Sequence, residues 1–189
     1  RGANNIFHLD SLFEITKKRG IINLRKNSII ALMIRAFFII LFWIIIVALA
    51  FGFYRTWRTQ KAPDQALFLA GKVPNPLPDG FYKGRAEMFP TLSWQGKRFA
   101  SLTKNGINVF KKDGVETEKY PFKTYVGKGI QDTDLQVFKI DYDVPQNPPW
   151  IRPILDEIVE IEPGKYLGKI HVRVIPGFPF SIGYFRQEK

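Results

Sequence analysis

The hydrophobic positions of the chain form one long unbroken run, from Ala36 to Tyr54, which contains no charged residue, amide or proline. Residues 29–34 extend this apolar run backward beyond Arg35. The hydrocarbon core of a bilayer is roughly 30 Å thick and is crossed by about 20 apolar residues in a helix. The pattern therefore predicts one transmembrane helix, over residues 29–55.

A cleaved signal peptide is the alternative interpretation of this run. Ala48-Leu49-Ala50 matches the small-residue pattern of a cleavage site at the end of an apolar segment. The segment ahead of the run extends over residues 1–35, however, and is far longer than the basic region of an ordinary signal peptide. We therefore expect an uncleaved signal-anchor, with residues 1–28 as a basic tail.

Beyond the apolar run, residues 56–78 contain four prolines, at positions 63, 74, 76 and 78. Neither a helix interior nor a central strand accepts such a run of prolines. We expect a semi-extended, proline-rich linker with one helical turn over residues 65–70.

From Asp79 onward the pattern changes to short aromatic and β-branched segments separated by turn residues. The segments predict strands over residues 81–89, 93–101, 107–112, 120–126, 135–143, 158–162, 166–174 and 178–185. Turns are expected at Asn105-Gly106, Lys112-Asp113-Gly114 and Pro163-Gly164, and a short helix over residues 150–155. In the last strand, Phe178, Phe180, Ile182 and Tyr184 alternate and are predicted to share one face. The fold class is a membrane-anchored, mainly-β protein in which residues 79–189 form an antiparallel barrel or sandwich.

The net charge of +11 is concentrated near the apolar run, because residues 1–61 contain ten Lys and Arg against two acidic residues. Positive charge beside a membrane span attracts anionic lipid headgroups, which favours a membrane over nucleic acid as the partner. Six basic residues precede the span closely and four follow it. This difference predicts a membrane protein with a cytoplasmic amino terminus and a β domain on the outer side.

Contacts with lipid or a partner are predicted for residues within and around the span. In the tail, Leu9, Leu12, Phe13 and Thr16 recur at helical spacing, and Gly20 is the expected helix end. This segment is an interfacial helix, a docking segment for a partner or a solvated tail. Ala48 and Gly52 form a small-xxx-small pattern that permits close helix approach. The predicted basic lipid contacts are Lys17, Lys18, Arg19, Arg25, Lys26 and Arg35, and the predicted interfacial aromatics are Phe51, Tyr54 and Trp57.

Short motifs from residue 78 onward combine aromatic residues with glycine, proline and acidic residues. They are Pro78-Asp79-Gly80-Phe81-Tyr82-x-Gly84, Trp94-x-Gly96-Lys97-x-Phe99, Tyr120-Pro121-Phe122-Lys123-Thr124-Tyr125-Val126-Gly127-Lys128-Gly129, Lys139-Ile140-Asp141-Tyr142-Asp143, Leu155-Asp156-Glu157-Ile158-Val159, Pro163-Gly164-x-Tyr166-Leu167-Gly168-Lys169 and Gly183-Tyr184-Phe185. Over residues 78–189 this set resembles an uncharacterised family of bacterial proteins. The second motif is also similar to the G-x-W-x-G motif of lipocalin-like domains, with Leu92 in place of its first glycine. The resemblance implies a lipocalin-like β fold and no catalytic role.

Three motifs contain residue types that could support chemistry. A Ser-His-Asp arrangement would need His171, which lies on the polar side of a predicted strand and is expected to be exposed. Asp132 with Asp134, or Asp141 with Asp143, suits a cation, but pairing of Asp141 or Asp143 with nearby Lys or Arg is the expected use. The run from Gly127 to Gly129 lacks the context of a phosphate-binding loop and is expected to end a strand.

These observations favour a non-catalytic, single-pass accessory subunit that docks on a larger respiratory or photosynthetic membrane complex. The alternative is a tethered lipocalin-like module that binds a lipid, pigment or quinone-like ligand. The chain has 17 Phe, 7 Tyr and 4 Trp, which either fill a core or line such a pocket. The expected partners are the bilayer and other subunits, with an apolar small molecule in the alternative. No cofactor, metal, nucleic acid or enzymatic activity is expected, and the absence of cysteine excludes disulfides and thiolate nucleophiles.

Overall fold

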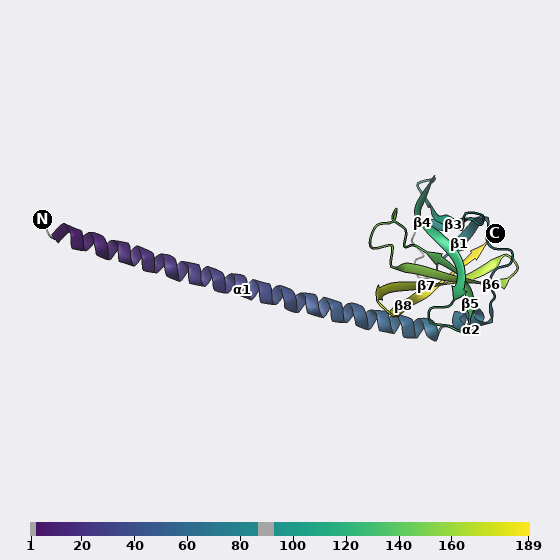
Figure 1. Ribbon diagram of the computed structural model, residues 1–189, viewed down its shortest axis with the longest axis horizontal. Helices are drawn as coiled ribbons and strands as arrows, with labels where there is room; N and C mark the ends of the chain where they lie inside the picture. The colour runs from purple at the N-terminus through teal and green to yellow at the C-terminus, as the bar shows by residue number, and fades with distance from the viewer. Residues whose placement is uncertain (1–2, 87–92) are drawn as a thin grey trace. The chain divides into compact units, whose positions relative to one another are not determined.

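The computed structural model describes residues 3–86 and 93–189, and it describes side chains from Ile30 onward apart from those between 87 and 92. The chain separates into two compact units, one ending at Ala50 and the other running from Phe51 to Lys189 (Figure 1). The second unit contains the end of the long helix, a short second helix and all eight strands that are described.

Helix α1 spans Ala3–Gln60 and includes the whole predicted transmembrane segment. Its stretch Ile30–Gln60 is long and apolar enough to cross a membrane, as a membrane anchor or a signal sequence would. The prediction that Gly20 ends a helix is wrong, because α1 continues through this residue. A single glycine destabilises a helix interior by only about 1 kcal/mol, which the surrounding turns readily offset.

Helix α2, Pro63–Ala70, occupies much of the segment that was predicted to be semi-extended. Pro63 lies in the first turn of α2, where the missing backbone N–H is not needed, so this proline begins a helix instead of preventing one. The side chain of Phe68 is fully buried in a cluster on the outer wall of the barrel. Its partners there are Val137, Val159, Leu167 and Tyr184. Residues 56–60 and 63–70 are therefore helical, and α2 is part of the folded unit.

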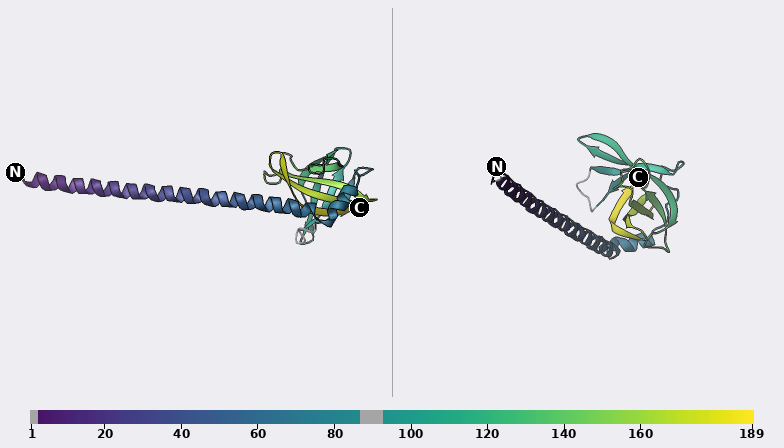
Figure 2. Two further views of the ribbon diagram at one scale, coloured as in Figure 1. Left: turned by 90° about the horizontal axis from the view of Figure 1, so that it is seen from below. Right: turned by 60° about the vertical axis from the view of Figure 1, so that its left-hand side comes forward.

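The eight strands form a closed antiparallel barrel in which each strand pairs with the next and β1 also pairs with β8 (Figures 1 and 2). Their bounds are β1 Gly80–Arg85, β2 Trp94–Ala100, β3 Asn105–Lys112, β4 Val115–Lys128, β5 Gln136–Asp141, β6 Ile154–Glu162, β7 Lys165–Ile175 and β8 Phe178–Glu188. The predicted mainly-β fold after an N-terminal apolar helix is thus confirmed. Of the two predicted alternatives, a barrel or a sandwich, the structure forms the barrel. Closure removes the unpaired strand edges that a sandwich would leave.

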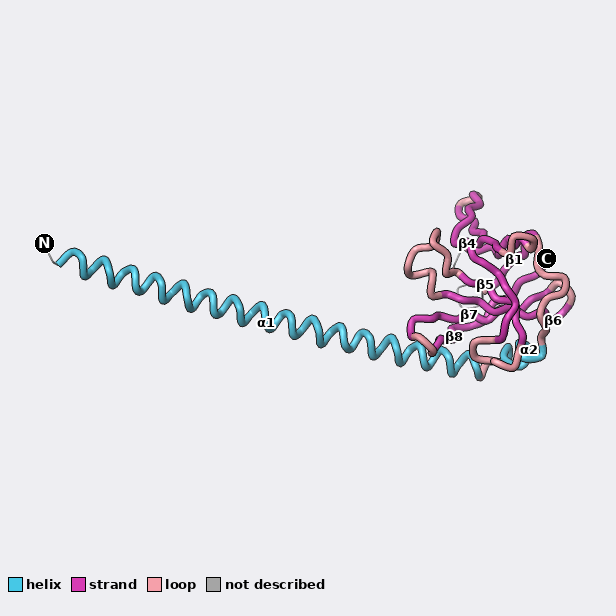
Figure 3. The backbone as a smooth tube through the Cα atoms, in the orientation of Figure 1, coloured by secondary structure: helices cyan, strands magenta, loops and turns pink. Residues whose placement is uncertain are grey.

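Several local predictions differ from the structure. Asn105 and Gly106 lie within β3, and the turn before β3 ends at Lys104, whose φ of 52° is left-handed. Residues 150–153 form turns and not a helix, because Ile154 already begins β6 (Figure 3). The turn at Pro163-Gly164 is confirmed. The turn predicted at Lys112-Asp113-Gly114 is confirmed for Asp113-Gly114, whereas Lys112 is the last residue of β3. The predicted first strand ends at 85 within the described chain, and its residues 87–89 lie outside the described residues.

Alternate residues of each strand face the barrel interior or the outer wall. On β6, Ile158 joins the aromatic interior core with Tyr82, Phe99 and Phe122, whereas the next residue, Val159, joins the outer cluster around Phe68. Helix α2 contacts the outer wall at β6 and β7. The wall is therefore buried on both faces here, in contrast to the usual single buried face of an antiparallel sheet.

The predicted alternation of β8 is wrong beyond Phe180. A register shift against β7 leaves Ile182 as an extra residue between the pairs His171–Ser181 and Ile170–Gly183. Ile182 lines the interior cavity, while Tyr184 packs on the outside against Phe68. A bulge shifts the facing of every residue beyond it, which alternation read from the sequence does not reveal.

Candidate binding site

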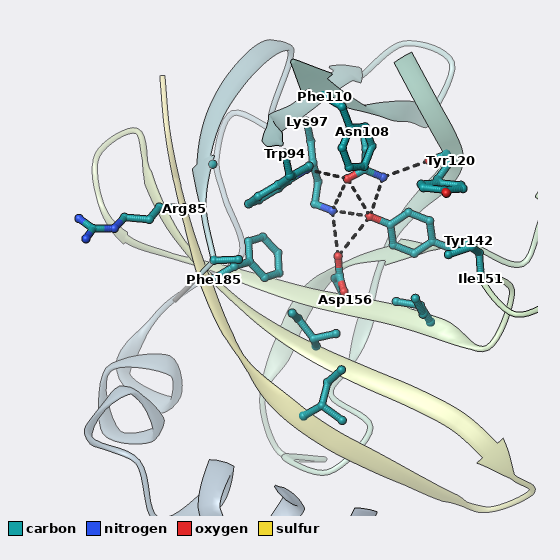
Figure 4. Close-up of a pocket in the computed structure, with 15 residues that line it drawn as sticks. Arg85, Trp94, Lys97, Asn108, Phe110, Tyr120, Tyr142, Ile151, Asp156 and Phe185 are labelled. Carbon is teal, nitrogen blue, oxygen red and sulfur yellow. Dashed lines mark hydrogen bonds and ion pairs between the residues drawn. The ribbon is translucent and has the colours of Figure 1, made fainter. Parts of the chain in front are cut away.

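The interior of the barrel contains a cavity of about 620 Å³ (Figure 4). Most of its wall is aromatic or aliphatic, and its polar groups are concentrated on one side. The lining residues are Gly84, Arg85, Ala86, Trp94, Lys97, Asn108, Phe110, Tyr120, Tyr142, Ile151, Ile154, Asp156, Ile170, Ile182 and Phe185. Figure 4 shows the side chain of Arg85 pointing away from the other labelled side chains.

Four buried polar side chains meet at this cavity, from β2, β3, the residue after β5 and β6. The Lys97 Nζ atom lies 3.0 Å from Asp156 Oδ2 and donates a hydrogen bond to Asn108 Oδ1 at 3.0 Å. It also donates to the hydroxyl oxygen of Tyr142. Asn108 donates to Tyr142 Oη at 3.0 Å, and the Tyr142 hydroxyl lies 3.4 Å from Asp156 Oδ2. We call Lys97, Asn108, Tyr142 and Asp156 the inner tetrad.

Aromatic rings surround the Lys97 ammonium group. Its Nζ atom lies 5.4 Å from the ring centre of Trp94, 5.5 Å from Phe122, 5.1 Å from Tyr142 and 5.2 Å from Phe185. Ring faces carry partial negative charge and attract a cation at such distances. Lys97 is only 3% exposed to solvent, and burial disfavours its positive charge. The rings and the Asp156 carboxylate together stabilise this charge.

Burial changes the protonation behaviour of two members of the inner tetrad. Burial lowers the pKa of Lys97, and the nearby Asp156 carboxylate opposes this shift without cancelling it. Burial, and then Asp156, raise the pKa of Tyr142 well above its usual value of 10.0. The tyrosine therefore keeps its proton at neutral pH and remains a hydrogen-bond donor. The tetrad as a whole is electrically neutral when Lys97 and Asp156 form their ion pair.

His171 is completely buried, so the prediction of an exposed strand histidine is wrong. Its Nε2 atom lies 3.1 Å from Glu157 Oε2, and its Nδ1 atom lies 3.0 Å from Ser181 Oγ. The last turns of α1 cover this place, where Thr56 Oγ1 accepts a hydrogen bond from Ser181 N at 3.0 Å. Thr56 and Ser181 are 125 residues apart in the sequence. The alternation of polar and apolar residues within one strand therefore could not predict that α1 covers this face.

Glu157, His171 and Ser181 have the residue types of a catalytic triad but not its hydrogen-bond directions. The Gln131 amide nitrogen donates to Pro179 O at 3.0 Å, which leaves its oxygen to accept from Ser181 Oγ at 2.6 Å. The serine proton is therefore directed to an amide and not to the imidazole that would have to remove it. All three side chains are fully buried, and we interpret them as a structural network.

The acidic pairs considered for cation binding are engaged by basic side chains. Asp141 Oδ1 lies 2.6 Å from Arg173 Nη2, and Asp132 Oδ2 lies 2.8 Å from the fully buried Lys169 Nζ. Lys169 also donates to Gln65 Oε1 at 2.9 Å, which ties α2 to β7. The expected pairing of Asp141 with a neighbouring cation is confirmed. Lys128 is the last residue of β4, as expected for the glycine-flanked strand end.

The predicted membrane contacts lie on α1. Arg35, Ala48, Phe51, Tyr54 and Trp57 are exposed, and the rings of Tyr54 and Trp57 are 6.4 Å apart. The side chains of Lys17, Lys18, Arg19, Arg25 and Lys26 lie outside the described residues.

Gly52 differs from the other predicted contacts, because it is buried against the ring of Phe180 in β8. A Cβ atom at Gly52 would lie 2.9 Å from this ring. The small residue therefore permits close approach, but to a strand of the same chain.

The sequence-based reasoning missed the inner tetrad, although three motifs quoted above contain Lys97, Tyr142 and Asp156. Lys97 lies two residues before Phe99, and Asp156 two residues before Ile158, so each charge shares a strand face with a core residue. Opposite charges at inward positions of two strands are the signal that could have indicated a buried pair. Their meeting across the barrel depends on closure and is not encoded locally.

Comparison with known proteins identifies no relative of this chain: no family model, no curated protein and no solved structure matches it. Of the resemblance to uncharacterised bacterial proteins, the eight-stranded antiparallel barrel is the part that the structure confirms.

Proposed function

We propose that this protein is a membrane-tethered, lipocalin-like binding module whose barrel holds a small, largely apolar and uncharged ligand. The observation that carries the proposal is the cavity of about 620 Å³ with apolar walls and the inner tetrad on one side. Ligand sites are concave, mainly apolar, roughly 300–1,000 Å³ in volume, and contain a few fixed polar groups. Eight-stranded barrels are wide enough to hold one such molecule.

The charge balance of the inner tetrad argues for an uncharged ligand. The Lys97 ammonium is already matched by Asp156 at 3.0 Å, and its hydrogens are directed to Asp156, Asn108 and Tyr142. A carboxylate ligand would therefore bring a second negative charge near Asp156 with no free cation in the tetrad to balance it. Such an unbalanced charge is strongly disfavoured in a site shielded from water.

Asp156 also indicates which polar group the ligand carries. Its Oδ2 atom contacts Lys97 and Tyr142, whereas Oδ1 has no hydrogen bond to any of the described residues. A hydrogen-bond acceptor beside an apolar cavity suits a ligand that donates, such as an alcohol or an N–H group. We therefore propose a ligand with an apolar body and a hydroxyl-type head, which includes alcohols of lipid origin and reduced quinone-like rings.

The proposal is tested by photo-crosslinking in the full chain reconstituted in lipid nanodiscs. The probes are a long-chain alcohol and the corresponding carboxylic acid, each with a photoreactive group on the chain. We expect the alcohol to label peptides that line the cavity, around Trp94 and Ile154, and unlabelled alcohol to compete. We expect the acid at the same concentration to label these peptides much more weakly.

A cavity-filling substitution provides the decisive comparison. Ile170→Trp places a large side chain in the cavity and is expected to abolish the labelling, whereas Val126→Trp, at an exposed position of β4 that does not line the cavity, is expected to preserve it. Labelling that is equal in the wild type and in I170W would refute the proposal.

The accessory-subunit hypothesis is the second candidate, and the exposed apolar surface of α1 supports it. Every side chain from Ile30 to Ala50 is exposed except Leu49. Lipid alone, or the helices of a larger complex, would cover this surface. Mild solubilisation of native membranes followed by size separation tests this candidate, because migration of the chain by itself would contradict it. In either case we propose insertion in a bacterial inner membrane with the amino terminus in the cytoplasm and the barrel outside.

A further inference from the structure

The cavity lies toward one end of the barrel. In an up-and-down barrel, the connections after β1, β3, β5 and β7 lie at the same end. Cavity-lining residues come from strand positions near this end: Ala86 just after β1, Trp94 at the start of β2, Phe110 near the end of β3 and Ile154 at the start of β6. We call this the cavity end, and the opposite end carries the β2–β3 turn with Leu102.

One hairpin tip at the cavity end packs against α1. The ring of Phe53 in α1 lies 5.1 Å from the ring of Phe178 and 5.4 Å from that of Phe180, at the start of β8. Phe53 is near the end of the apolar run, which finishes at Tyr54 and is followed by Arg55. The β7–β8 tip therefore lies beside the point where the chain is expected to leave a bilayer.

Polar contacts fix this hairpin to the helix. Thr56 Oγ1 accepts from Ser181 N at 3.0 Å, Thr59 Oγ1 donates to Ser181 O at 3.3 Å, and the Arg55 guanidinium donates to Ile182 O. These bonds join residues 55, 56 and 59 of α1 to Ser181 and Ile182 in the first half of β8. The distance of the hairpin tip from the aromatic end of the apolar run is thus set by the folded structure of residues 51–189 itself.

The side chains at the tip are apolar and exposed. Val174 is 58% exposed and Phe178 is 42% exposed, although both lie in a small folded unit with a well-packed core. On the neighbouring part of α1, Phe51 is 61% exposed and Trp57 is 58% exposed. Single exposed apolar residues are ordinary, but an apolar surface continuous with the end of a membrane segment is typical of a membrane-contacting surface.

We propose that the β7–β8 tip inserts into the headgroup region of the membrane beside α1, so that the cavity end of the barrel faces the bilayer. The lipid bilayer is the occupant, because the tip continues the surface of the aromatic residues that end the apolar run. The membrane contact stands whether or not the cavity binds a ligand. Where both proposals hold, the ligand passes between bilayer and cavity without crossing water.

Site-directed spin labelling of the full chain in liposomes tests the contact, and the absence of native cysteine allows single labels without further changes. The labelled variants are Val174→Cys at the tip and Leu102→Cys as control. Leu102 is 97% exposed and lies at the opposite end of the barrel. We expect the label at 174 to collide more with dissolved oxygen, which concentrates in lipid, than with a water-soluble nickel chelate. We expect the reverse at 102.

A second variant, Pro176→Cys, keeps the test decisive should V174C fold poorly, since residue 176 is exposed in the same tip. Labels at 174 and 176 that are as accessible to the nickel chelate as the label at 102 would overturn the proposal. Protection of the tip labels from both reagents would overturn it as well, because that result would mean that protein and not lipid covers the tip.

Discussion

Asp156 and Glu157 are neighbours on β6, and both are buried carboxylates, yet they serve different regions of the molecule. Asp156 faces inward and pairs with Lys97 at 3.0 Å beside a cavity. Glu157 faces outward, lies 3.1 Å from His171 and 3.4 Å from Lys139, and accepts a hydrogen bond from Ile130 N at 2.8 Å. The inner pair leaves room for a ligand, whereas the outer network is enclosed by the 129–135 loop and the end of α1. The surroundings, and not the ion pair itself, therefore distinguish a candidate site from structural support.

The largest effect is expected from breaking the inner pair. Lys97→Met leaves the Asp156 carboxylate buried without its cation, and loss of one partner of a buried ion pair destabilises a protein by about 3–5 kcal/mol. The measurement is denaturant unfolding of the full chain in detergent micelles.

The double variant Lys97→Met with Asp156→Leu separates the charge from the packing. Because both charges are removed together, we expect the double variant to be clearly more stable than K97M alone. Equal stabilities of K97M and the double variant would show that the two residues are not coupled.

Removing the outer carboxylate is expected to have a smaller effect that depends on pH. Burial raises the pKa of Glu157, but the hydrogen bond and charge of His171, the Ile130 N–H and Lys139 outweigh it and hold the pKa below its usual 4.5. A carboxyl group with a lowered folded pKa stabilises the protein above the unfolded pKa, and this contribution disappears as the pH falls through the folded value.

Glu157→Gln should therefore destabilise the full chain at pH 7 by about 1.5–3 kcal/mol, the range for hydrogen bonds to charged groups. It should also lose less stability than the wild type between neutral and acidic pH. Unfolding free energies measured across this range test the prediction, and parallel pH profiles for the two proteins would contradict it. Asp141 retains its own acid dependence in both proteins, because its pKa is also lowered.

The contact between α1 and the outer wall provides the next comparison. Gly52→Leu forces the helix and Phe180 apart and is expected to destabilise the second unit by about 1–3 kcal/mol, as overpacking does. Ala48→Leu is the matched control one turn earlier, at an exposed position, and should change the unfolding free energy little. If both variants unfold alike, the close approach at Gly52 does not contribute to stability.

The smallest effect is expected for an exposed ion pair. Arg98 lies 2.8 Å from Glu118 and 3.3 Å from Glu116 on the barrel surface. Exposed pairs typically contribute less than about 1 kcal/mol, so Arg98→Ala should lie near the limit of detection in the same unfolding assay. A loss as large as that of K97M would mean that burial does not decide the strength of these pairs.

Much of the fold could be predicted from local pattern, and little of the site could. The run of Ala36–Tyr54 and the alternation of the later segments are sufficient for the helix and the strands. Asp156 and Lys97 lie in motifs that the sequence displays, but their sequence separation hides their contact. His171 was predicted to be exposed because its strand alternates polar and apolar residues. It is buried because the last turns of α1 pack over the polar face of that strand.

The sequence by itself determined the apolar helix, the strands and the rule that neighbours such as Asp156 and Glu157 face opposite sides, because these follow from local geometry. Only the tertiary structure decided which polar residues are buried. Gln65 meets Lys169 across 104 residues, and barrel closure brings Lys97 to Asp156. Burial depends on what packs on each face, and the segments that pack there are distant along the chain.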